Sequence, residues 1–145
     1  GGSGKHGGDT LKGVFAEDLR QFPPYEPQEF VGRLAERARF VRAWTVFMSE
    51  WPLVLTPFLP HPTFDWDRDA QGPEGVRDVL GSAIYSYSMN FMGLPAANVP
   101  ASYNEGQPIG VQIVGQRFRE DLLLDAAEVI ERKVGIMAEH LWAGG

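Results

Sequence analysis

The chain has 145 residues, a length that suits one folded domain. It contains no Cys, which excludes disulfide scaffolds, thiolate metal clusters and cysteine nucleophiles. The net charge of −6 disfavours a protein that grips a phosphate backbone, so we expect no nucleic-acid partner. Because no apolar run approaches the roughly 20 residues that span a bilayer, and no secretory signal opens the chain, we expect no membrane partner and a cytoplasmic location.

The first part of the chain is predicted to lack regular structure. Residues 1–13 include six glycines and show no hydrophobic periodicity, which is typical of a flexible arm. The prolines of residues 23–27 favour an extended lead-in. We therefore divide the chain into this arm with its lead-in, residues 1–26, and an α/β region, residues 27–145.

A helix of about six turns is predicted to begin at Pro27 and to end before Pro52. Its faces outside the apolar stripe carry several arginines, which indicate either an anion site or, as the favoured interpretation, a solvated helix face. The apolar residues recur at spacings of three and four and form the stripe Phe30, Leu34, Ala38, Val41, Trp44 and Met48.

A short strand at residues 53–56 follows, and its continuously apolar sequence is typical of a strand covered on both faces. A proline-rich loop then extends to Pro73, and loops of this length are often functional. A second helix is predicted over residues 74–92, with Gly93 as its C-cap.

The remaining elements are a hairpin and a last helix. Strands are predicted at residues 96–100 and 109–115 around a turn at 103–108, and a helix at residues 120–134. The sequence therefore predicts an α/β fold in which a small mixed sheet of about three strands packs with three helices. Because such apolar strands need further neighbours, we expect either self-association or a place in a larger fold.

Catalytic and metal-binding patterns are weak. No Ser lies in a Gly-x-Ser-x-Gly elbow, and a triad built on His61 or His140 is a disfavoured alternative. The acidic run at residues 65–69 resembles the start of a calcium loop, but Ala70 and Val76 stand where that loop needs Gly and Glu. A solvated acidic loop is the favoured interpretation, so we expect no metal and no cofactor.

The later motifs carry a family resemblance. The run Asn90-Phe91-Met92-Gly93-Leu94-Pro95-Ala96, a small strand ending in Val99-Pro100, and Gln107-Pro108-Ile109-Gly110-Val111-Gln112 follow one another at fixed spacing. Together with Thr56-Pro57 at the end of a strand, they resemble the carboxy-terminal part of the amidase signature family, over residues 28–135. The motif positions that we interpret as structural are Asn90, Gly93, Pro95, Pro100, Gly110 and Gln112.

The resemblance implies amide chemistry and the larger α/β/α layered fold of the family. Family members use a Ser nucleophile, a second Ser in a cis peptide and a Lys base, all in their amino-terminal part, and no residue of this sequence matches them. The resemblance therefore implies roughly the last third of an amide hydrolase, inactive alone, without a cofactor. The implied partners are the missing amino-terminal segment or another copy of the chain, with a small amide substrate only in the complete enzyme.

In the family this last third supplies part of the acyl-side pocket wall, and the loop after Thr56 is the candidate here. An equally weighted interpretation of its aromatic residues is a satellite hydrophobic cluster. For the whole chain, the alternative to an amidase portion is a non-catalytic binding or assembly module that self-associates through a sheet edge. The substrate-pocket candidates are Thr56, Pro57, Phe58, His61, Phe64 and Trp66.

Overall fold

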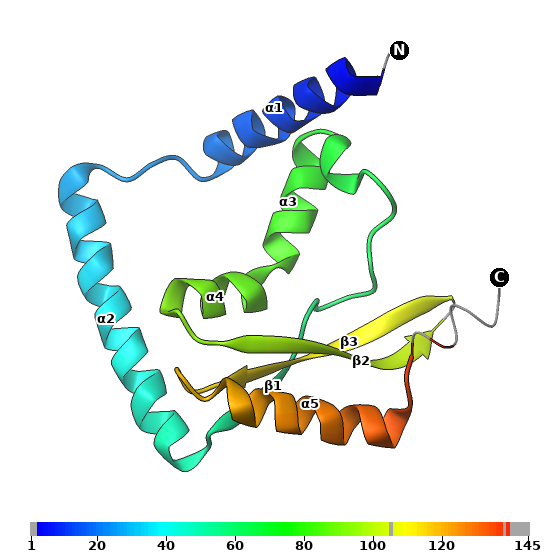
Figure 1. Ribbon diagram of the computed structural model, residues 1–145. Helices are drawn as coiled ribbons and strands as arrows, with labels where there is room; N and C mark the ends of the chain where they lie inside the picture. The colour runs from blue at the N-terminus through cyan, green and yellow to red at the C-terminus, as the bar shows by residue number, and fades with distance from the viewer. Residues whose placement is uncertain (1–2, 105, 138, 140–145) are drawn as a thin grey trace.

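A computed structural model describes residues 3–104, 106–137 and 139. The described part is a mixed α/β fold, as the sequence predicts, with a three-stranded sheet between helices (Figure 1). Within it, no helix is both long and apolar enough to cross a membrane. The elements in chain order are α1 (Ser3–Gln21), α2 (Pro27–Glu50), β1 (Leu53–Pro57), the short 3-10 helix η1 (Arg68–Ala70), α3 (Pro73–Ser82), α4 (Ile84–Met92), β2 (Ala96–Asn104), β3 (Gln107–Gly115) and α5 (Glu120–Val134).

The strand order is β1-β3-β2, with β3 antiparallel to both neighbours. The predicted hairpin is confirmed, and both of its strands reach closer to the turn than the sequence indicated. Since β1 and β2 each run opposite to β3, they run in the same direction. Their carboxyl ends therefore meet at one edge of the sheet, and that geometry positions the candidate site described below.

The core has two parts, one on each face of the sheet. Val114 packs with Met48 of α2 and with two methionines of α4. The preceding residue, Ile113, points to the opposite face and packs with Leu123 of α5 and with Val99. Figure 1 shows α4 and α5 on opposite sides of the sheet, so even this small fold has three layers.

Helix α2 begins at Pro27 and stops before Pro52, as predicted, but only half of its apolar stripe is used. Met48 is fully buried, and Val41 and Trp44 pack beside it. Phe30 and Leu34, at the other end of the stripe, remain about half exposed because no described element covers them.

The expectation of a flexible arm at residues 1–13 is wrong from Ser3 onward, because these residues belong to helix α1. The glycine content obscured a second pattern, in which Leu11, Phe15 and Leu19 recur every four residues. Helix α1 lies near α3 and η1, and Gln21 at its end donates a hydrogen bond to the Pro73 carbonyl (2.9 Å).

The single helix predicted over residues 74–92 is two helices, α3 and α4, separated at Ala83. The amide of Ala83 bonds to Leu80, three residues back, instead of continuing the α-helical pattern. A Gly81-Ser82 pair precedes the break, and the Ser82 hydroxyl donates to the carbonyl of Asp78, both of which are common causes of a kink.

Gly93 ends α4 in the left-handed conformation, with φ of 65°, as predicted. Its amide bonds to the Asn90 carbonyl and that of Leu94 bonds to the Met89 carbonyl, which together form a Schellman motif. Leu94 then packs against the methionine cluster, so the helix end and the core fix each other.

Strand β1 was expected to be covered on both faces, and this expectation is wrong for one of them. Leu55 is 62% exposed on the face where α5 lies, because α5 contacts β2 and β3 but does not reach β1. Strand β1 is also an edge strand. The described fold therefore leaves one side and one edge of an apolar strand uncovered.

Candidate functional site

A cavity of about 330 Å³ lies where the carboxyl ends of β1 and β2 meet. The loop after β1 forms one wall and the tip of the β2–β3 hairpin forms the other. In α/β proteins this edge of a sheet, beyond the carboxyl ends of strands, is where ligands commonly bind. The lining residues are Phe58, Leu59, His61, Pro62 and Thr63 from the loop and Asn104, Gln107, Pro108, Ile109 and Gly110 from the hairpin.

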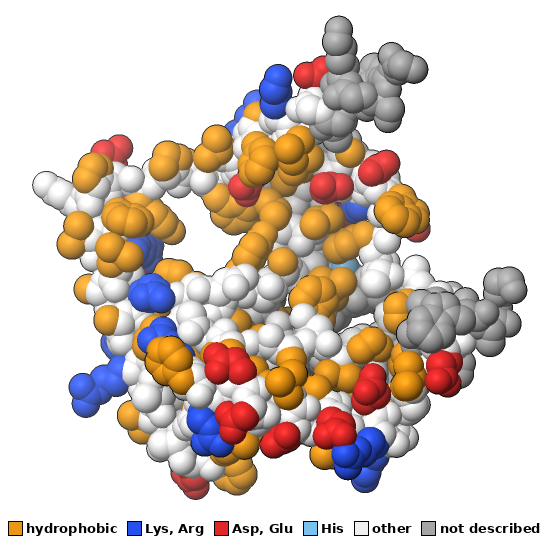
Figure 2. All heavy atoms as spheres, in the orientation of Figure 1, with side chains coloured by type: hydrophobic (Ala, Val, Ile, Leu, Met, Phe, Trp, Pro, Cys, Tyr) orange, Lys and Arg blue, Asp and Glu red, His pale blue; other side chains and the backbone are white. Residues whose placement is uncertain are grey.

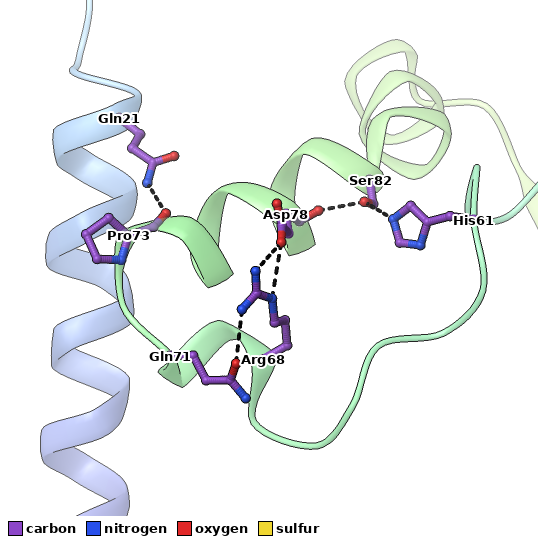
Figure 3. Close-up of polar contacts among 7 residues, drawn as sticks. All are labelled: Gln21, His61, Arg68, Gln71, Pro73, Asp78 and Ser82. Atoms are coloured by element: carbon purple, nitrogen blue, oxygen red, sulfur yellow. Dashed lines mark hydrogen bonds and ion pairs between the residues drawn. The ribbon is translucent and has the colours of Figure 1, made fainter.

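Side-chain contacts hold the loop wall in place from both directions. Toward the hairpin, the Thr63 hydroxyl donates to the side-chain carbonyl of Gln107. Toward α3, Nε2 of His61 hydrogen-bonds to Oγ of Ser82, and Figure 3 shows the imidazole pointing at the end of that helix. The other ring nitrogen, Nδ1, donates to the Pro62 carbonyl at 2.6 Å.

A further contact fixes the later part of the same loop. Arg68 of η1 forms an ion pair with Asp78 of α3 and also donates to the side chain of Gln71 (Figure 3). The hydrogen bond to Asp78 raises the pKa of Arg68 above its ordinary value of 12.5. The loop is therefore fastened to α3 at two places, His61 and Arg68.

The contact between His61 and Ser82 invites comparison with a nucleophile–base pair, but the geometry is structural. Ser82 is only 6% exposed, and its hydroxyl also bonds to the carbonyl of Asp78 at 2.6 Å, the backbone contact expected of a helical serine. The Asp78 carboxylate faces Arg68 and does not orient the His61 ring. His140, the other histidine considered from sequence, lies outside the described residues.

The structure brings together only part of the predicted pocket set. Phe58 and His61 line the cavity, and Phe64 packs edge-on against the His61 ring with centroids 4.6 Å apart. Pro57 lies exposed at the end of β1, and Trp66 is 94% exposed, away from both walls. The hairpin-tip residues were missed, because only the strand order places them opposite the loop.

Thr56 lies on another surface, where it accepts a hydrogen bond from the side-chain amide of Gln112 (3.1 Å). Gln112 is 2% exposed, so this bond satisfies an otherwise buried amide. Thr56 also borders a second, largely apolar cavity of about 510 Å³ between α2 and α4. That cavity is lined by Phe40, Trp44, Thr56, Ile84, Tyr85, Ser88, Met89, Phe91 and Met92.

The other motif positions have backbone roles. The Pro95 carbonyl accepts the amide of Gly115, and Pro100 pairs with Gly110 just before a bulge in β2. A Cβ at Gly110 would meet only the Val99 carbonyl at 3.6 Å, an ordinary contact, so nothing in the described structure requires glycine there. Among the described residues, no group of three His, Asp or Glu side chains is placed to hold a metal ion.

The fold is that of amidase-type hydrolases. The structure of 6-aminohexanoate cyclic dimer hydrolase superimposes with a TM-score of 0.69 at 24% identity, covering 86% of this chain and 28% of that one. The corresponding protein of the glutamyl-tRNA(Gln) amidotransferase from Thermotoga maritima gives a TM-score of 0.61 at 21% identity, covering 93% of this chain and 28% of that one.

Sequence comparison gives the family. The profile of the family described as Amidase matches residues 25–124, and the chain therefore belongs to the amidase family. It is 40% identical over 109 residues to an indoleacetamide hydrolase of Bradyrhizobium japonicum, covering 74% of this chain and 23% of that protein. It is 34% identical over 98 residues to a component of the glutamyl-tRNA(Gln) amidotransferase of Brucella ovis, covering 67% of this chain and 20% of that protein. The chain thus spans about a fifth of the length of these curated relatives.

Proposed function

We propose that this chain forms the carboxy-terminal portion of an amide hydrolase whose catalytic Ser, Ser and Lys lie outside these 145 residues. The observation that carries the proposal is the family match over residues 25–124 in a chain that spans only 23% of the indoleacetamide hydrolase it resembles. In the complete enzyme the reaction is acyl transfer: the Ser oxygen attacks the carboxamide carbon, the amine leaves with a proton, and water hydrolyses the acyl-enzyme.

The role of this chain in that reaction is to complete the sheet and to form one side of the substrate pocket. The cavity at the ends of β1 and β2 supports this role, with Phe58 and His61 in its wall. The hydrogen bonds from His61 and Thr63 fasten the wall to α3 and to the hairpin, so the wall is formed before a substrate arrives. The open face and edge of β1 fit a sheet that continues into the rest of the enzyme.

The test joins the 145-residue chain to the amino-terminal part of the Bradyrhizobium japonicum hydrolase, in place of the segment that it matches. Labelling by a serine-reactive fluorophosphonate and release of ammonia from indole-3-acetamide are measured for the hybrid. The controls are the chain alone and the amino-terminal part alone. We expect labelling and turnover by the hybrid and neither by the chain alone.

Labelling of the chain alone would overturn the proposal, because catalysis would then reside within these 145 residues. A hybrid that is folded and monomeric but inactive would also contradict it. That result would favour the alternative of a binding or assembly module.

A further inference from the structure

The wall of the cavity between the loop and the hairpin is uncharged. None of its ten described lining residues is Asp, Glu, Lys or Arg. Phe58, Leu59 and Ile109 supply apolar surface, and Asn104 and Gln107 supply neutral side-chain amides. The wall can therefore contact an apolar chain and hydrogen-bond to neutral polar atoms.

The groups nearby that could carry charge are already engaged by the protein. Both ring nitrogens of His61 have hydrogen-bond partners, the Pro62 carbonyl and the Ser82 hydroxyl. The neighbouring guanidinium of Arg68 is paired with the Asp78 carboxylate. A carboxylate that entered the cavity would lose part of its hydration and meet no cation in the described wall, which is unfavourable.

We propose that this cavity selects carboxamides whose acyl group is uncharged and rejects those that carry a carboxylate. The inference rests on the proposed function and adds the substrate class. Its physical basis is the cost of desolvating an unpaired charge, set against the gain from covering an apolar chain with Phe58, Leu59 and Ile109.

The test compares two amides of the same length in the active hybrid. Hexanamide ends in a methyl group, whereas adipamate, the anion of 6-amino-6-oxohexanoic acid, ends in a carboxylate. We expect kcat/KM for hexanamide to exceed that for adipamate by at least about tenfold, which corresponds to about 1.4 kcal/mol.

A substitution then tests whether this wall is responsible. Ile109→Lys places a cation in the lining, and we expect the hexanamide-to-adipamate ratio to fall by about tenfold. The matched control is Val129→Lys on α5, which adds the same charge at a similarly exposed position outside the cavity and should leave the ratio unchanged. Glu105, which lies outside the described residues, is replaced by Gln in a third variant, and we expect no change in the ratio.

Three results would overturn the inference while the proposed function stands. They are equal kcat/KM for the two amides, a ratio that Ile109→Lys does not move, and a Glu105→Gln variant that itself admits adipamate. If the hybrid is inactive, the proposed function fails, and binding to the isotope-labelled 145-residue chain decides the inference by NMR. Hexanamide should then shift the backbone signals of Thr63 and Ile109 and adipamate should not, and the absence of any shift with hexanamide would overturn it.

Discussion

Gly75 is the residue at which α3 and η1 come closest. A Cβ built on Gly75 would lie 1.9 Å from the carbonyl oxygen of Arg68, a distance that no relaxed structure allows. The obstacle is backbone, so it cannot rotate away. The loop that lines the cavity therefore depends on a glycine as well as on the ion pair between Arg68 and Asp78.

We expect Gly75→Ala to lower the free energy of unfolding by about 1–3 kcal/mol, because η1 must move away from α3. Gly81→Ala in the same helix is the matched control, since nothing lies within 4 Å of an added Cβ there. That change should raise the free energy of unfolding by about 0.5–1 kcal/mol. Urea unfolding measures both, and equal effects of the two substitutions would contradict the close approach.

Helix α4 is held at its carboxyl end by two arginines from other elements. Arg117, between β3 and α5, donates to the carbonyls of Gly93 (3.0 Å) and Met92. Arg37 of α2 donates to the carbonyl of Phe91, with its guanidinium 5.8 Å from the centre of the Phe91 ring. Cations at a helix carboxyl end also interact favourably with the helix dipole.

Arg117→Gln should therefore lower the free energy of unfolding by about 1–2 kcal/mol, through loss of charged hydrogen bonds to helix-end carbonyls. The control is Arg132→Gln on α5, where the arginine forms an exposed ion pair with Glu128 of the same helix. An exposed pair of this kind contributes at most about 0.5 kcal/mol, so the control should be nearly neutral. Chemical denaturation compares the two, and a neutral Arg117→Gln would show that the cap is dispensable.

The molecule as a whole exposes more apolar surface than its own elements can cover. Figure 2 shows hydrophobic side chains spread over α1 and α2 and a hollow between these helices and α3. Leu55 on β1 and Phe118 before α5 are largely exposed. A chain that folds as a portion of a larger sheet has this character, because its interfaces with the remainder are left open.

We expect the isolated chain to self-associate through the β1 edge, with a sedimentation coefficient that rises with concentration in the micromolar range. Leu55→Lys places a charge on that strand and should shift the equilibrium toward monomer, since charges on edge strands oppose pairing. Leu124→Lys on α5 is the control, because Leu124 is similarly exposed but lies on a helix. A wild-type chain that sediments as a monomer at every concentration would contradict this expectation.

Local sequence signals predicted most of the elements. Pro27 and Pro52 bracket α2, the hairpin strands flank the predicted turn, and α5 has the predicted bounds. The misses have local causes of a different kind. At α1 the glycines outweighed a leucine and phenylalanine stripe, and at Ala83 a continuous apolar pattern hid a break.

The candidate site was less predictable, because it is made by strand order. The sequence pointed to Phe58 and His61 but also to Trp66, which is exposed, and it gave no sign of Ile109 or Gln107. Those hairpin residues stand far from the loop along the chain; Gln107 is 44 positions from Thr63, to which it is hydrogen-bonded. They meet the loop only because β3 lies between β1 and β2 and makes the two strands run in the same direction.

By itself, the sequence determined the family, the α/β class and the positions of most helix ends, because these depend on periodicity, prolines and glycines that act within a few residues. The tertiary structure alone decided which of the apolar residues are buried, which loop faces the hairpin, and which partners engage His61, Arg68 and Gln112. The physical reason is that burial and long-range hydrogen bonds depend on which elements become neighbours, and a neighbour distant along the chain leaves no mark on the local pattern.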